Sequence, residues 1–174
     1  MGMNKSKFAF FVILLLMSVV VTACNIFPKS QFVTMTTTPI GTIAQQPDGE
    51  IGDQVRRDAL SIIVLSVEEV SVYEDVKPKA GNKYIAIELE IESMMDSSDV
   101  NPLDARLQDS DGNVYFLMFG GKDPFLQAQY GLSKGAQVKG WITYEVPETA
   151  KGFWFIYEPI FSTYSEKIII NLDK

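Results

Sequence analysis

The sequence predicts an all-β protein whose main domain, residues 54–174, is a sandwich of two antiparallel sheets. Three observations support this fold class. Apolar and polar residues alternate in several short stretches, turn residues separate these stretches, and no long stretch repeats with the helical period of 3.6 residues. Strand-like and helical stretches do not alternate either, which argues against a parallel sheet covered by helices. Short strands joined by turns are typical of a two-sheet sandwich.

The first half of the domain contains the clearest strand pattern. Residues 59–75 are rich in β-branched residues, which favours one strand or two in succession. In residues 83–93, aliphatic side chains alternate with glutamates, so we expect a half-buried strand with a glutamate-lined outer face. The alternating sets are Ile85, Ile87, Leu89 and Ile91 on one side and Glu88, Glu90 and Glu92 on the other.

The second half of the domain contains four more expected strands and one expected helical turn. The strands lie within residues 109–119, 136–147, 151–159 and 166–172. Asp111 and Gly112 precede the apolar part of the first of these, and Asp-Gly is the favoured sequence of a tight hairpin turn. Pro147 is expected to end the second strand, whose outer face would carry Thr143. Pro102 would begin the helical turn.

The N-terminal residues predict a leader that is removed. Residues 1–23 combine an early positive charge, an apolar stretch and a small residue before the expected cleavage point, as in a secretory signal peptide. Residues 21–24, Val-Thr-Ala-Cys, resemble a bacterial lipobox, and this resemblance implies that Cys24 is acylated and becomes the mature N-terminus. Two or more acyl chains give stable anchoring. The alternative is an uncleaved apolar helix that spans the membrane.

Residues 24–53 predict an acylated cysteine followed by a disordered spacer. The segment is rich in threonine, proline, glutamine and glycine, and it shows no sustained strand or helix period. A flexible chain of this length has a root-mean-square reach of roughly 30 Å. Both interpretations of the leader place the domain outside the cytoplasm, on a cell membrane and facing away from the cell interior.

Composition excludes several classes of chemistry. The formal net charge of the chain is −7, and removal of the leader with Lys5 and Lys7 leaves 13 basic and 22 acidic residues, a net charge of −9. This charge disfavours nucleic-acid binding. The chain contains no histidine, the usual general base and metal ligand, and its single cysteine cannot form an intramolecular disulfide.

Three blocks of the domain resemble the bacterial domain of unknown function 4352. They are "PKAGNKYIAIELEIES", "LQDSDGNVYF" and "LSKGAQVKGWITYEVPETAKGFWFIY", and the resemblance covers about Leu60 to Leu172. The residues in the expected order are Gly81, Asn82, Lys83, Asp111, Gly112, Tyr115, Gly135, Gly140, Val146 and Pro147. The resemblance implies an immunoglobulin-like sandwich that is often carried on secreted proteins or lipoproteins. It supplies no catalytic residue.

One acidic loop is a candidate metal site. Asp109, Asp111 and Asn113 stand at alternate positions, as at the start of a calcium-binding loop. The spacing departs from the EF-hand rule, because glycine is the fourth residue rather than the sixth and Gly120 stands where the final glutamate belongs. A hairpin turn explains the same residues, so we expect no cofactor and no metal here.

The aromatic strands are the candidate partner surface. In residues 152–157 and 114–119 both faces of the expected strand are apolar, so a second cover is required. Trp154, Ile156 and Leu117 would then point outward, and we expect residues 120–135 to fold over these faces, because connecting loops commonly bury such clusters. The alternative is that these three residues contact a partner.

The sequence therefore predicts a lipid-anchored extracytoplasmic module that binds a protein or another envelope component and catalyses no reaction. One alternative is an accessory or structural subunit of an envelope complex. A second alternative is an extracytoplasmic hydrolase that uses carboxylates, which would require carboxyl groups in unlike environments.

Overall fold

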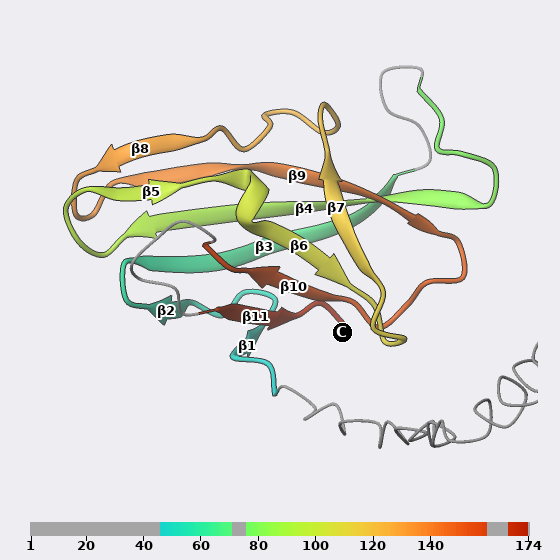
Figure 1. The fold of residues 1–174 in the computed structure, drawn as a ribbon, viewed down its shortest axis with the longest axis horizontal. Helices are drawn as coiled ribbons and strands as arrows, with labels where there is room; N and C mark the ends of the chain where they lie inside the picture. The colour runs from blue at the N-terminus through green and yellow to red at the C-terminus, as the bar shows by residue number, and fades with distance from the viewer. Residues whose placement is uncertain (1–45, 71–75, 160–166, 174) are drawn as a thin grey trace, which may run out of the picture. The chain divides into compact units, whose positions relative to one another are not determined.

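The computed structural model describes residues 46–70, 76–159 and 167–173. The expected leader, Cys24 and residues 24–45 of the expected spacer lie outside the described residues. Within the described ranges, no helix is both long and apolar enough to cross a membrane. The described strands form the predicted β-sandwich (Figure 1).

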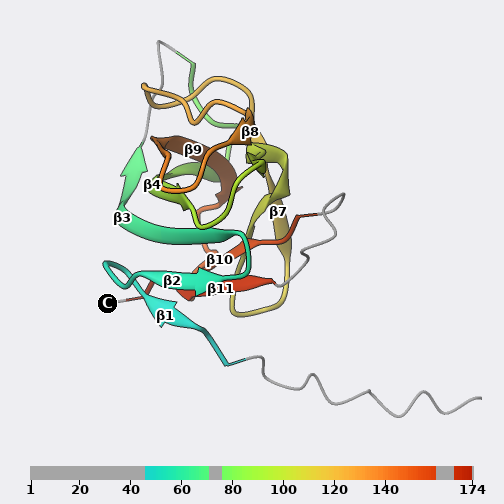
Figure 2. The same cartoon turned by 90° about the vertical axis from the view of Figure 1, so that its left-hand side faces the viewer.

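Nine strands form one continuous sheet that folds into two layers (Figure 2). One layer contains, in order, β1 (Gly49–Glu50), β11 (Ile168–Asn171), β10 (Trp154–Tyr157), β6 (Ala105–Gln108) and β7 (Val114–Met118). The other layer contains β9 (Gln137–Pro147), β4 (Asn82–Ser93), β3 (Leu60–Val70) and β2 (Val55–Arg57). Strand β7 joins the layers, because its first residues pair with β6 while Leu117 and Met118 pair with β9.

Strand β4 is the centre of its layer and confirms the predicted alternation. It pairs antiparallel with β3 on one side and β9 on the other. Its aliphatic set, predicted to face inward, is buried, whereas its three glutamates are partly exposed on the opposite face. The described part of the β-branched stretch before it, up to Val70, forms one strand, β3, with an irregularity between Val64 and Ser66. Residues 71–75 of that stretch lie outside the described residues.

The hydrophobic core lies between the two layers and draws on both. Large, fully buried members include Leu89 from β4, Ile142 and Tyr144 from β9, and Leu107 and Phe155 from the facing layer. Removing a side chain of this size from water contributes about 1.5–3 kcal/mol to folding. The core therefore fixes the inward face of each strand, and the remaining apolar side chains must lie on outer faces.

A short sheet and one helical turn complete the domain. Strands β5 (Ser98–Val100) and β8 (Gln129–Leu132) pair with each other. The helical turn expected at Pro102 forms as the 3-10 helix η2 (Pro102–Asp104). Asn101 caps it, since its side-chain oxygen accepts a hydrogen bond from the Leu103 amide at 3.1 Å. The Asn101 amide donates to the Tyr157 hydroxyl at 3.1 Å, which ties η2 to β10.

The domain begins earlier than predicted. Residues 46–53, which the sequence places in the disordered spacer, belong to the folded domain, so the expected boundary at residue 54 is wrong. Strand β1 pairs with β11, and this two-residue pair is parallel rather than antiparallel. Because the pairing partner is more than 100 residues away, local sequence could not identify β1 as a strand.

Candidate functional site

The acidic loop between β6 and β7 is a hairpin turn organised by one carboxylate. Asp109 is buried, and its Oδ1 accepts hydrogen bonds from the Asp111 amide at 3.0 Å and the Asn113 amide at 2.9 Å. Its Oδ2 accepts from the Asn113 side chain at 2.9 Å and the Tyr115 hydroxyl at 2.6 Å. Gly112 adopts a φ of 85°, the left-handed conformation that glycine tolerates. The hairpin predicted from Asp111 and Gly112 is confirmed.

The same contacts shift the pKa values of Asp109 and Tyr115. Burial alone would raise the pKa of Asp109, but hydrogen bonds from Tyr115, Asn113 and the Asp111 amide outweigh it and hold the pKa below its ordinary value. The pKa of Tyr115 rises to about 12, because burial and then the hydrogen bond to Asp109 disfavour the phenolate. Asp109 is therefore a charged structural acceptor.

The central carboxylate of the metal-ligand pattern is occupied by hydrogen bonds from the protein. Asp109 directs both oxygens at protein donors, while Asp111 and Asn113 are exposed. In the part of the chain that the structure describes, no group of three acidic, histidine or cysteine side chains is placed to hold an ion. Two other loop carboxylates likewise accept from backbone amides, Asp96 from Lys134 at 3.0 Å and Asp99 from Gly131 at 2.8 Å.

The glutamate row of β4 lies on the outer face of its layer. Glu88 forms an ion pair with Lys139 of β9 at 3.2 Å and accepts a hydrogen bond from Ser66 of β3 at 3.3 Å. Glu90 lies opposite Lys139 in the β4–β9 register. Cross-strand pairing of this kind is the arrangement expected of a solvated sheet face.

The three predicted partner-surface residues have different environments. Leu117 packs against the core, so its predicted outward orientation is wrong. Ile156 points outward as predicted but is only 8% exposed, between Arg106 of β6 and Ile169 of β11 in the sheet register. Trp154 is partly exposed. The structure therefore does not give these three residues one shared exposed surface.

The exposed apolar residues of β7 belong to the alternating set that does not contain Leu117. Val114 and Phe116 lie on the outer face and are 44% and 71% exposed. The sequence shows that both alternating sets of this strand are apolar, but it does not show which set faces the core. The pairing of Leu117 with Tyr144, a buried core residue of β9, decides this.

The segment after β7 pairs with the edge of β9 through a parallel bridge between Phe125 and Trp141, and its Leu126 joins the core. The backbone of Leu126 donates to the Trp141 carbonyl at 2.9 Å, and the Trp141 amide donates to the Pro124 carbonyl at 2.8 Å. A Cβ added to Gly140 would lie 2.7 Å from the Leu126 backbone, so only glycine allows this close approach. Thr143, which the alternation placed on an outer polar face, is fully buried here.

Lys122 extends the cover across the indole ring of Trp141. Its ammonium lies 3.6 Å from the ring centroid and forms an ion pair with Glu68 of β3. Its backbone amide donates to the Thr143 hydroxyl at 3.2 Å. The sequence predicts that residues 120–135 cover the strands of residues 114–119 and 152–157, but Gly121 and Lys122 lie over β9 instead. Val114 and Phe116 of β7 remain exposed, so the expected cover of this strand is wrong.

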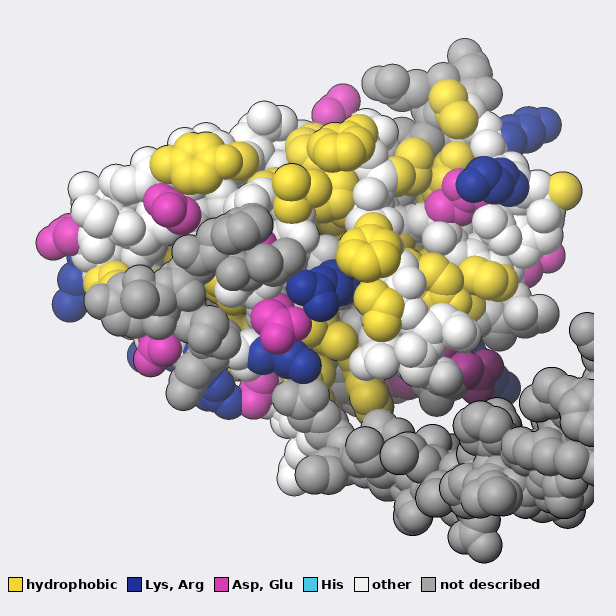
Figure 3. Space-filling model, viewed as in Figure 1, with side chains coloured by type: hydrophobic (Ala, Val, Ile, Leu, Met, Phe, Trp, Pro, Cys, Tyr) yellow, Lys and Arg dark blue, Asp and Glu magenta, His cyan; other side chains and the backbone are white. Residues whose placement is uncertain are grey.

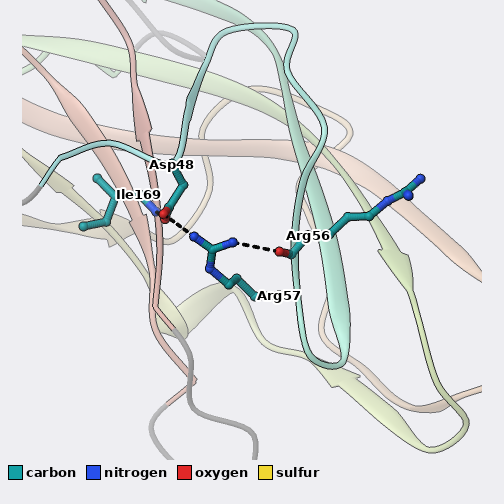
Figure 4. A network of polar contacts seen from close by, with 4 residues as sticks. All are labelled: Asp48, Arg56, Arg57 and Ile169. Carbon is teal, nitrogen blue, oxygen red and sulfur yellow. Dashed lines mark hydrogen bonds and ion pairs between the residues drawn. The ribbon is translucent and has the colours of Figure 1, made fainter.

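The chain enters the domain through a network around Asp48 (Figure 4). The Asp48 amide donates to the Ile169 carbonyl at 2.7 Å, and Oδ2 accepts from the Ile169 amide at 2.8 Å. Oδ1 forms an ion pair with Arg57, whose guanidinium also donates to the Arg56 carbonyl at 3.1 Å. Asp48 thus connects β11 of one layer to β2 of the other.

Comparisons with solved structures show the same fold in three bacterial proteins. A candidate lipoprotein (ycdA) of Bacillus subtilis strain 168 matches 71% of this chain at 13% identity, with a TM-score of 0.58, and the match covers 38% of that protein. The yjhA protein of B. subtilis matches 72% of this chain and 99% of its own length at 20% identity, with a TM-score of 0.58. MPT63, a secreted protein of Mycobacterium tuberculosis, matches 75% of this chain and all of its own at 12% identity, with a TM-score of 0.54.

The family of the chain follows from its sequence and agrees with the fold. No curated protein matches the chain. A family model does match, over residues 49–168, which begins at β1 and ends at β11. This range contains the Asp109 hairpin, the covered face of β9 and the exposed face of β7. The chain belongs to the DUF4352 family, the domain of unknown function 4352.

Proposed function

We propose that this protein is a membrane-anchored extracytoplasmic module that binds another protein or envelope component and does not catalyse a reaction. The lipobox-like residues before Cys24 support the anchor. The similar folds of a candidate lipoprotein and of a secreted protein support an extracytoplasmic location. In this proposal the acyl chains on Cys24 insert into the membrane, the residues up to 45 separate the domain from the membrane, and the sandwich provides the binding surface.

One observation carries the binding function. Phe116, at the middle of β7, is 71% exposed on a rigid sheet, and Val114 beside it is 44% exposed. Adjacent exposed apolar residues on a folded domain are typical of interaction surfaces. An aromatic side chain held by a sheet loses little conformational freedom on binding, which favours its use as an anchor.

The anchor is tested by replacing Cys24 with serine in the full chain. The wild-type protein should enter the detergent phase and gain the mass of acyl chains at residue 24, whereas C24S should lose both properties. A wild-type protein that keeps residues 1–23 and carries no acyl mass would be an uncleaved membrane-spanning form. That result would overturn the lipid anchor while leaving the location unchanged.

The binding function is tested by placing a photoreactive amino acid at position 116 or, as a control, at the exposed position 56 on β2. Irradiation of intact producing cells should give a defined adduct from position 116 and none from position 56. The proposal would be overturned if neither position 114 nor position 116, the two exposed outer-face positions of β7, formed an adduct. A partner that co-purifies with the protein in a stoichiometric complex, without irradiation, would indicate an accessory subunit.

A further inference from the structure

Four exposed apolar side chains lie on neighbouring elements and are called here the distal apolar surface. They are Leu103 of η2, Phe116 of β7, Phe119 directly after β7, and Tyr130 of β8, with exposed fractions of 54%, 71%, 80% and 71%. η2 contacts β7 and follows β5, which pairs with β8. Figure 3 shows apolar side chains gathered over this part of the molecule.

The distal apolar surface lies far from the point where the chain enters the domain. In Figures 1 and 2, which differ by a quarter turn about the vertical axis, β1 lies at the bottom and β8 at the top. The incoming chain is held at β1 by the Asp48 network. A partner that binds the part of this surface on β8 therefore approaches the domain from the side away from β1.

Free charge beside this surface is acidic. Asp99 of β5 and Asp123 of the covering loop are exposed, and in the described ranges neither carboxylate takes part in an ion pair. Of the nearby basic groups, Lys122 is engaged with Glu68 and Arg106 with Glu158. Lys134 lies beyond the end of β8, where its backbone amide donates to Asp96. Residues 125–132, which carry Tyr130, contain no charged side chain.

We propose that the distal apolar surface binds a protein segment with an apolar centre and flanking lysine or arginine residues. This inference rests on the proposed binding function and adds the chemistry of the partner. Complementary charge at the border of an apolar contact steers association and rejects like-charged partners. A second copy would bring its own carboxylates against Asp99 and Asp123. An anionic bilayer would meet the same repulsion, and it would have to reach the face opposite β1.

Two synthetic peptides of 12 residues test this chemistry. They share one leucine- and phenylalanine-containing centre, and lysines flank it in one while glutamates flank it in the other. The full acylated chain is held in phosphatidylcholine nanodiscs, with empty nanodiscs as the blank, and fluorescence anisotropy measures binding. We expect the lysine peptide to bind and the glutamate peptide not to bind. Salt at about 0.5 M should weaken the binding, since screening shortens the range of exposed charges.

Variants then locate the binding surface. F119S and F116S should each lower the affinity for the lysine peptide at least about tenfold, as expected of an anchor residue. V76S is the matched control, because Val76 is 57% exposed but lies outside the distal apolar surface, and its affinity should be unchanged. Circular dichroism should show that all three variants remain folded.

Several results would overturn the proposal. Binding of both peptides, binding of neither, or wild-type affinity in F119S would each reject a basic, apolar partner at this surface. Flotation of C24S with phosphatidylcholine vesicles that depends on Phe119 would assign the surface to a bilayer instead. If the peptides fail but the photoreactive residue at position 116 still forms its adduct in cells, only the partner chemistry is wrong. If both fail, the proposed function falls as well.

Discussion

The outer faces of β7 and β9 adjoin on one sheet but differ in their cover. Met118 of β7 lies beside Thr143 of β9, so the two outer faces are continuous. On β9 the backbone of Gly121 and Lys122 lies against Thr143, the Lys122 ammonium lies over the ring of Trp141, and both covered residues are buried. On β7 no described segment buries Phe116, which remains 71% exposed. The comparison shows that an apolar outer face becomes core or surface according to where the connecting loop returns.

The largest expected effect comes from truncating the core residue that the segment after β7 contributes. Leu126 is fully buried in the core and its backbone lies against Gly140, so Leu126→Ala should lower the free energy of unfolding by about 2–5 kcal/mol through the cavity it leaves. Leu103→Ala is the control, because Leu103 is 54% exposed and its truncation should cost less than about 0.5 kcal/mol. Urea denaturation measures both values. Equal losses would show that the loop is not an integral part of the core.

An intermediate effect is expected from the hairpin that positions β7. In Asp109→Asn, an amide group would face the Tyr115 hydroxyl and the Asn113 side chain, both of which now donate to Oδ2. The loss of these contacts should cost about 1–3 kcal/mol at neutral pH. Asp111→Asn is the control, because the Asp111 side chain is exposed, and it should be nearly neutral.

The Asp109 contribution should also depend on pH in a stated direction. The pKa of Asp109 is lower in the folded state than the ordinary value of about 3.9. Its stabilisation is therefore complete above about pH 4 and is lost as the pH falls through the folded-state pKa. The stability gap between wild type and Asp109→Asn should shrink on acidification in urea titrations. A gap that widens at low pH would contradict the assignment of a lowered pKa.

A smaller effect on stability is expected from replacing Lys122, which lies over the ring of Trp141. Lys122→Gln removes the ammonium from the Trp141 ring and from Glu68, and it should cost about 0.5–1 kcal/mol at low salt. Lys151→Gln should have no measurable effect, because Lys151 is exposed and its ammonium has no ion pair among the described residues. Thermal unfolding at low and high salt compares the two variants. A salt-independent loss in Lys122→Gln would indicate packing rather than charge.

The smallest effect on stability is expected on the exposed face of β7. Phe116→Ser should change the free energy of unfolding by less than about 0.5 kcal/mol, because the ring is largely in water in the free domain. The same variant should lose binding in the peptide experiment. A large loss of stability in Phe116→Ser would show that the ring contributes to folding, and it would remove the difference between the two outer faces.

The sequence was sufficient wherever one face of a strand was polar. In β4, glutamates alternate with aliphatic residues, so the period of two identified the buried set. In β7 both sets are apolar, and the inward set was decided by pairing with β9, which is distant in sequence. For the same reason local alternation placed Leu117 outside. In β9 the alternation identified the inward set, but it could not show that Gly121 and Lys122 bury Thr143 on the outer face. The missing information was the contact between segments, not the character of any residue.

The entry network also has a mechanical consequence. Any tension in the preceding chain reaches the sandwich at Asp48, whose carboxylate contacts Ile169 in one layer and Arg57 in the other. The load is therefore divided between both sheets at the point of entry instead of peeling one edge strand away. The hairpin of β6 and β7, which presents Phe116, lies outside this path of force. Force applied to the chain before Asp48 should therefore strain the junction at β1 before it reaches the exposed face of β7.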